Sequence, residues 1–138
     1  MKKILISGLL AGLVMLIVGA MLWFAFTLAF SSLKAEYANP ALFRPFSDPA
    51  FLYLYVVQPF LLGILLSWLW SKTNTLFKEK NWYKNGLRFG FTYWLVTLPG
   101  LMLAYASSPF SLLVIVSWSV TGLVQALCAG LIYAKMNR

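Results

Sequence analysis

The sequence predicts an all-α integral membrane protein, a bundle of four transmembrane helices in a single domain that covers residues 1–138. First, the chain is 62% hydrophobic and 10% charged, whereas about 25% of the residues in a soluble domain are charged. Second, it contains four apolar stretches of about 20 residues or more, the length that crosses a bilayer core of about 30 Å. Third, Lys and Arg are concentrated in the short segments between these stretches, where they orient a membrane protein.

The first apolar stretch, residues 4–30, follows Lys2 and Lys3 and begins like a secretory signal peptide. The apolar region of a signal peptide covers about 7–15 residues, whereas this stretch is far longer and contains no charged residue. The sequence around Ala29 is also a poor cleavage site. We therefore expect the stretch to be retained as the first span, tilted or projecting beyond the hydrocarbon because of its length.

Residues 31–48 form the longest segment outside the predicted spans. Pro40 and Pro45 exclude one continuous helix, and the charged residues of the segment cancel each other. Its aromatic residues Tyr37, Phe43 and Phe46 suit either a loop on the membrane surface or a loop folded over the mouth of the bundle.

The second span is expected at residues 50–71. Asp48 has the side chain of a helix cap, and Pro49 fits the first helical turn, where its missing N–H costs nothing. Within the span, Pro59 cannot donate a hydrogen bond to an earlier carbonyl and should bend the helix. Its neighbour Gln58 makes a polar position inside the membrane.

The third span is expected at residues 85–106 and the fourth at residues 109–134. Pro99 should kink the third span because it frees the carbonyl of an earlier residue. Ser108 is expected to cap the fourth span, with Pro109 in its first turn. The connection is so short that these two spans must be antiparallel neighbours.

The segment between the second and third spans is strongly basic. The residues predicted to contact lipid headgroups there are Lys78, Lys80, Trp82 and Lys84. A lysine near anionic lipid contributes on the order of 1 kcal/mol, and an aromatic ring among lysines suits the headgroup level. We therefore expect membrane lipids as partners and no nucleic acid, although the net charge of the chain is +8.

The charge distribution also predicts the orientation in the membrane. Nine of the eleven Lys and Arg residues lie near the amino terminus, between the second and third spans, or near the carboxyl terminus. The other two connections carry only Lys34 and Arg44. By the positive-inside rule both termini face the cytoplasm, so the expected location is the cell membrane, which in a bacterium is the inner membrane.

Small residues spaced four apart let helices pack closely, and three such series occur in the predicted spans. They are Gly8 and Gly12 in the first span, Gly86 and Gly90 in the third, and Gly122, Ala126 and Gly130 in the fourth. These series predict helix packing inside the bundle. The alternatives are association of the protein with itself and docking on a larger membrane protein.

The sequence also contains signs of an internal duplication. The first and third spans share the pattern GLxxG, and the second and fourth share a Gln followed five residues later by a Gly. Two related helix hairpins would produce this pattern. The spacing from the preceding proline differs between the second and fourth spans, so a duplication requires a heptad gap. Chance similarity among apolar helices is the alternative.

The residue types that carry most catalytic and metal chemistry are scarce. The chain has no histidine, one cysteine and three acidic residues, and these acidic residues lie outside the predicted spans. We therefore predict no enzyme activity, no catalytic residues, no metal and no cofactor. The size and span count are similar to those of small multidrug-resistance exporters, but the first span has no glutamate, the residue expected at their deciding position.

Gln58 and Gln125 are the candidate ligand-binding residues. Helical rise places them about 21 Å and about 15 Å from the cytoplasmic interface, near the middle of the bilayer, where each amide needs a partner. They could bond each other, a freed carbonyl or a ligand. Two main hypotheses follow: a non-enzymatic protein that associates with lipid or a membrane partner, or a small transporter or channel for a neutral or amphipathic solute. An enzyme acting on lipid ranks third, because Ser and Tyr residues are present but nothing in the sequence activates them.

Overall fold

The structure is a computed structural model that describes residues 1–137, and all regular secondary structure in this range is helical. In chain order the helices are α1 (Lys2–Ala29), α2 (Ser31–Tyr37), α3 (Pro49–Thr73), the 3₁₀-helix η1 (Asn74–Leu76), α4 (Trp82–Ser107) and α5 (Leu112–Met136). Four of them, α1, α3, α4 and α5, are long and apolar enough to cross a membrane, as the sequence predicts.

The start of α3 follows the prediction. The carboxylate of Asp48 accepts a 3.0 Å hydrogen bond from the backbone N–H of Ala50, and Pro49 occupies the first helical turn. The side chain of Asp48 therefore caps the helix. The helix continues through Pro59 as a single element.

The start of α5 differs from the prediction. Ser108 is not its cap: the cap is Ser111, whose hydroxyl accepts a 3.3 Å hydrogen bond from the backbone N–H of Val114. The intervening Phe110 stacks on Phe43 with ring centroids 5.0 Å apart. Phe110 thus contacts the loop before α3, and residues 108–111 are not helical.

Two other boundaries differ from the prediction. The first seven residues of the expected loop, residues 31–37, form the helix α2. α4 begins at Trp82, three residues before the predicted start. Trp82 and Lys84 therefore belong to the first turn of α4, whereas Lys78 and Lys80 lie in the connection before it.

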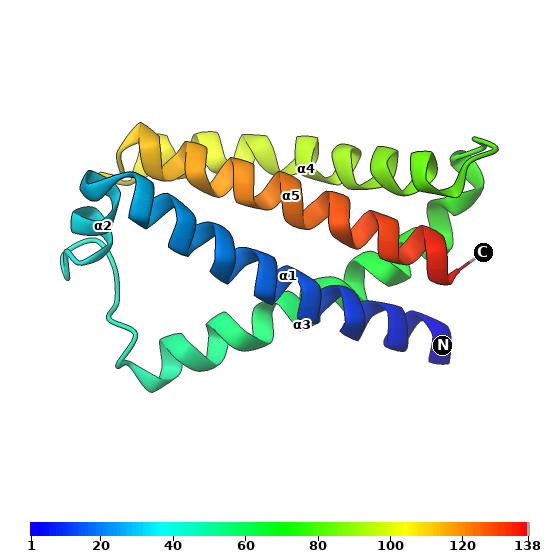
Figure 1. Cartoon of the computed structure of the whole chain (residues 1–138), viewed down its shortest axis with the longest axis horizontal. Coiled ribbons are helices and arrows are strands. Elements are labelled where there is room, and N and C mark those ends of the chain that lie inside the picture. Colours follow the sequence, from blue (N-terminus) through cyan, green and yellow to red (C-terminus); the bar gives the residue numbers. More distant parts are fainter. Residues whose placement is uncertain (138) are drawn as a thin grey trace.

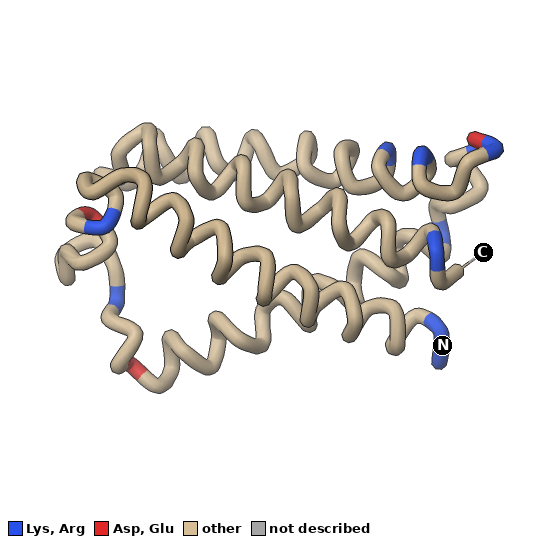
Figure 2. Tube along the Cα trace, viewed as in Figure 1, with Lys and Arg blue, Asp and Glu red and all other residues tan. Residues whose placement is uncertain are grey.

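The long helices form an open bundle (Figure 1). α1 packs against α3 and α5, and α5 packs against α4, whereas α3 makes few contacts with α5. Both termini and the α3–α4 connection lie at one end of the molecule, where most Lys and Arg residues gather (Figure 2). We call this end the basic end. The opposite end, with α2, residues 38–48 and the α4–α5 connection, is called the cap end.

An aromatic cluster near the basic end joins three helices. Trp70 of α3 contacts Phe89 of α4 edge to face, with ring centroids 5.2 Å apart, and Phe89 contacts Tyr133 of α5 at 6.0 Å. The hydroxyl of Tyr133 donates a 2.9 Å hydrogen bond to the carbonyl of Gly63 in α3, and the whole Tyr133 side chain is buried. These contacts close the bundle at this end.

α1 crosses α3 at its glycines. A Cβ atom on Gly8 would stand 2.6 Å from the Cα of Ile64, and one on Gly12 would stand 2.6 Å from the Cα of Phe60. From the other side, a Cβ atom on Gly63 would meet the carbonyl oxygen of Gly8 and the backbone nitrogen of Gly12. The two backbones can lie this close only because these positions lack a side chain.

α4 and α5 repeat this contact. A Cβ atom on Gly86 would stand 2.6 Å from the carbonyl oxygen of Gly130, and one on Gly90 would meet the carbonyl oxygen of Ala126. A Cβ atom on Gly130 would in turn meet the backbones of Gly86 and Gly90. The register matches that of α1 and α3, with Gly130 in the place of Gly63.

Candidate functional site

Beyond the crossing with α1, α3 diverges toward the cap end (Figure 1), and a cavity lies between these helices. It has a volume of about 510 Å³ and is lined by residues of α1, α2, α3, α5 and the segment 38–48. Its walls are mostly aromatic and include Trp23, Tyr37, Phe46, Tyr55 and Trp118. We call this cavity the outer chamber.

A smaller cavity of about 280 Å³ adjoins the outer chamber. All four long helices contribute to its lining, α3 with Leu62, α4 with Tyr93 and Leu101, and α1 with Met15. We call it the side cavity. Gln58, Trp118 and Gln125 line both cavities. We call these three residues the junction. The structure therefore brings the two predicted ligand-binding glutamines to one place.

The amide of Gln125 is partly satisfied within the chain. Its Nε2 donates a 2.7 Å hydrogen bond to the backbone carbonyl of Met15 in α1. Gly19 makes room for this contact, because a Cβ atom there would stand 2.6 Å from the same Nε2. The Oε1 of Gln125 accepts no hydrogen bond from residues 1–137, so one side of the amide is still available.

Gln58 occupies the equivalent position in the other helix pair, five residues before Gly63 as Gln125 is five residues before Gly130. Its side chain is exposed and lines both cavities. Within the described part of the chain its amide has no hydrogen-bond partner, and the two glutamines do not bond each other. The junction thus presents one free amide and one free carbonyl oxygen.

Residues 31–48, which comprise α2 and the loop before α3 and which we call the cap segment, are attached to α5 by hydrogen bonds. Glu36 of α2 accepts a 2.8 Å bond from the backbone N–H of Ser111 and a 2.6 Å bond from its hydroxyl. Tyr37 accepts a 2.8 Å bond from the indole nitrogen of Trp118. Burial raises the pKa of the Tyr37 phenol above its ordinary value, so this acceptor stays neutral. Together the three bonds fix α2 over the start of α5.

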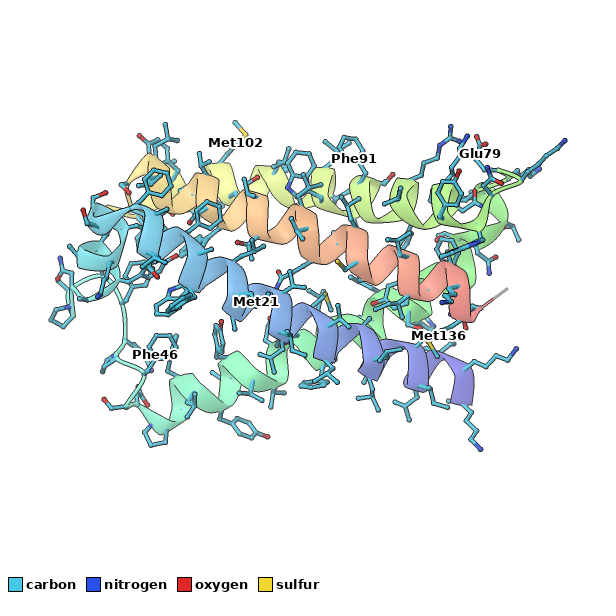
Figure 3. The ribbon with its side chains drawn as sticks, viewed as in Figure 1. Met21, Phe46, Glu79, Phe91, Met102 and Met136 are labelled. Carbon is cyan, nitrogen blue, oxygen red and sulfur yellow. The ribbon has the colours of Figure 1, made fainter. Side chains whose placement is uncertain are left out.

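The attachment of the cap segment to α3 is aromatic. Phe46, labelled in Figure 3, lies with its ring centroid 5.7 Å from Trp23 of α1, 5.4 Å from Phe51 and 6.1 Å from Tyr55 of α3. Of the two arrangements that the sequence leaves open for this segment, the structure has the one folded over the mouth of the bundle.

Charge is found at the mouth of the outer chamber and not at the junction. Arg44 is the one charged residue that lines the chamber in the part of the chain that the structure describes, and its guanidinium lies 3.6 Å from the carboxylate of Asp48. The side cavity is lined by uncharged residues throughout residues 1–137. The deep part of the site therefore suits an uncharged group.

The predicted packing residues fall into two groups. Gly8, Gly12, Gly86, Gly90, Ala126 and Gly130 lie at helix contacts within the chain. These faces are covered and are not free for a partner. Gly122 departs from the prediction: outside its own helix backbone, a Cβ atom there would meet no described atom within 4 Å. It lines the side cavity because its face of α5 points to the gap between α3 and α4.

The predicted headgroup residues lie at the basic end. The side chains of Lys78, Lys80 and Lys84 are exposed, whereas Trp82 is partly buried against the core. The connection is folded back on α4 by the ion pair of Arg88 with Glu79, at 2.7 Å.

Most residues that line the site are not among the predicted ones, and we consider four of them: Gly19, Arg44, Trp118 and Thr121. A signal for two of them is present, because Trp118, Thr121 and Gln125 are spaced as residues on one face of a helix are. Arg44 and Gly19 join the site only through the tertiary fold, so no local pattern identifies them.

Together these features define an all-helical protein with four helices long and apolar enough to cross a membrane and, between them, a largely aromatic cavity with one charged residue at its mouth. Comparisons of the chain with protein-family models, with curated proteins and with solved structures found no match.

Proposed function

We propose that this chain is an integral membrane protein that binds a lipid or a similar amphipathic molecule in the outer chamber, without catalysing a reaction. The observation that carries the proposal is the free amide of Gln58 on the wall of a cavity between membrane-length helices. Without water, an unpaired amide in hydrocarbon costs several kcal/mol. A ligand that bonds to Gln58 removes this cost.

The proposal includes a membrane orientation, with both termini in the cytoplasm. The gathering of Lys and Arg at the basic end supports it through the positive-inside rule. In this orientation the outer chamber faces the outer leaflet. The location proposed with it is the cell membrane, or the inner membrane if the protein is bacterial.

The two helix pairs, α1 with α3 and α4 with α5, are proposed to be copies of one ancestral hairpin. The matching glycine contacts support this origin, because Gly63 and Gly130 meet their partners in the same register. The equivalent positions of Gln58 and Gln125 support it as well. Duplication would have produced two amides at one junction, of which one now bonds within the chain.

At the basic end, the exposed residues Lys78, Lys80 and Lys84 are proposed to contact anionic lipid headgroups. Association with a second copy or with a larger membrane protein would have to use other surfaces than the covered glycine faces. The outward side of α4, on which Phe91 and Met102 point away from the bundle (Figure 3), is such a surface.

Native mass spectrometry after gentle extraction from a membrane tests the binding proposal. We expect the wild-type protein to retain a small hydrophobic molecule and Gln58→Leu to retain about tenfold less of it. Val57→Leu is the matched control, because Val57 is the exposed neighbour of Gln58 on α3. An empty wild-type protein, or equal retention by Gln58→Leu, would contradict the proposal.

A second candidate, a transporter for a neutral or amphipathic solute, is favoured by two adjoining cavities that are both lined by Gln58 and Gln125. Transport also requires a path through the basic end, which Trp70, Phe89 and Tyr133 close. Flux of a fluorescent amphiphile across proteoliposomes separates the candidates. Binding without flux supports the first proposal, and flux that Gln58→Leu abolishes supports the second.

A further inference from the structure

The proposed function places a ligand in the outer chamber and does not explain why a second cavity, the side cavity, adjoins it. It lies between α3 and α4, and its lining residues Gln58 and Gly100 are exposed. Cβ atoms on Gly100 and Gly122 would meet no atom of residues 1–137 within 4 Å, apart from their own helix backbones. A space is therefore kept open on a side of the bundle that faces membrane hydrocarbon.

Away from the junction, the walls of the side cavity are mostly apolar, and the polar groups among their side chains are the hydroxyls of Tyr93 and Thr97. Leu62, Leu101 and Met15 contribute aliphatic surface. The hydroxyl of Thr97 donates a 2.7 Å bond to the carbonyl of Trp94 in its own helix, so it is occupied. A hydrocarbon chain is the occupant that this surface favours, because bilayer chains surround it and apolar burial needs no hydrogen bonds.

The junction has the opposite requirement. The free amide of Gln58 can donate and accept, and the free Oε1 of Gln125 can accept. A hydrocarbon chain across these atoms would leave them unpaired. A charged group would lack a counter-charge, because no charged residue of the described chain lines the side cavity and Arg44 at the chamber mouth is already paired with Asp48. An uncharged group that contains oxygen satisfies both conditions.

Resting on the proposed binding function, we infer that the ligand is a lipid with an uncharged hydroxyl or carbonyl group and at least one long hydrocarbon chain. The oxygen-bearing group bonds Gln58 and Gln125 at the junction. The chain lies in the side cavity and leaves between α3 and α4 into the bilayer. The outer chamber holds the rest of the polar end against its aromatic walls.

Three probes with one chain and different head charges test this inference: oleyl alcohol, oleate and oleylamine. The protein in detergent is labelled with oleyl alcohol that carries a photoreactive diazirine in the first half of its chain, which is the part expected inside the side cavity, and the modified peptides are mapped. We expect labels around Leu62 and Leu101, and competition by unlabelled oleyl alcohol at about tenfold lower concentration than by oleate or oleylamine.

The possible label positions separate this inference from the proposed function. Labels confined to the aromatic residues of the outer chamber would overturn the chain path and leave binding in the chamber intact. Equal competition by the three probes would overturn the uncharged head. Labels in neither cavity, together with an empty protein in native mass spectrometry, would overturn the proposed function itself.

Filling the side cavity gives the matching genetic test. Gly122→Leu should lower labelling around Leu62 and Leu101 about tenfold, whereas Val120→Leu on the exposed side of the same helix should not change it. Thermal stability measured in parallel shows whether the variant is folded, and Gly100→Leu replaces it if it is not. A folded variant of either kind with wild-type labelling would overturn the chain path.

Discussion

The two helix pairs of this protein share one contact and differ beyond it. In both pairs a glycine of the later helix lies against two glycines of the earlier one, so the backbones cross at the same register. Toward the cap end, α4 and α5 stay together, with the indole of Trp94 donating a 2.9 Å hydrogen bond to the carbonyl of Ser119. α3 instead leaves α1, and its residues from Leu52 to Gln58 are exposed.

The difference has a local cause in the sequence. Pro59 stands in α3 where Ala126 stands in α5, four residues before the glycine of the contact. Proline has no N–H to donate to the carbonyl of Tyr55, so α3 is weakened where the helices begin to separate. A glycine contact therefore fixes where two helices cross, and the residues beyond it decide whether a cavity opens.

The largest effect is expected from breaking the shared contact. Gly63→Leu and Gly130→Leu should each lower the free energy of unfolding by about 3 kcal/mol or more, because each side chain would overlap backbone atoms of the facing helix. Gly122→Leu is the matched control and should be nearly neutral. Unfolding in mixed micelles measures all three, and equal losses for Gly63 and Gly122 would contradict the contact.

A smaller effect is expected from the bond that joins the two pairs. Tyr133→Phe removes the buried hydroxyl that donates to the carbonyl of Gly63, at 2.9 Å, and should cost about 1 kcal/mol of unfolding free energy. Tyr105→Phe, at an exposed position, serves as the control in the same unfolding experiment. A Tyr133→Phe protein as stable as this control would mean that the pairs are not held together by the bond.

The two glutamines should respond in opposite directions. Gln125→Leu removes an interhelical hydrogen bond to Met15 of 2.7 Å and should destabilise the empty protein by about 0.6 kcal/mol. Gln58→Leu replaces an unpaired amide and should leave the stability unchanged or raise it. Unfolding of delipidated protein checks both variants, and destabilisation by Gln58→Leu would show that its amide has a partner.

The smallest effect concerns the caps of α3 and α5. Glu36→Gln keeps the shape of the side chain but removes the negative charge at the start of α5, and should cost about 0.5 kcal/mol. Asp48→Asn makes the matching change at α3, where the cap is local and an amide caps nearly as well. Thermal unfolding compares the two, and we expect the larger shift for Glu36→Gln.

Features of the fold that depend on residues close in sequence can be predicted, and features that depend on contacts between distant residues cannot. Apolar length alone predicts the four long helices, and the local pair of Asp48 and Pro49 predicts the start of α3. The cap of α5 is missed because Ser108 and Ser111 are both followed by suitable residues, and the choice depends on distant contacts with Glu36 and Phe43.

For the site, the sequence predicts two of the residues but not their contacts. Amides in apolar helices are rare enough to single out Gln58 and Gln125, and the structure brings both to the junction. The sequence does not show that Gln125 bonds Met15 whereas Gln58 has no partner. This difference depends on how far α3 separates from its neighbours. Gly122 continues a series of small residues in sequence, yet it faces a cavity, because spacing does not tell which neighbour lies opposite.

Pulsed electron paramagnetic resonance on two spin-label pairs compares the cap ends of the helix pairs directly, in a Cys128→Ser background. One pair replaces Leu28 of α1 and Leu52 of α3, both exposed, and the other replaces Met102 of α4 and Val116 of α5, which line one surface pocket. We predict a clearly longer distance for the first pair than for the second. Similar short distances in both pairs would mean that α3 does not separate from α1, and would contradict the outer chamber and the function proposed for it.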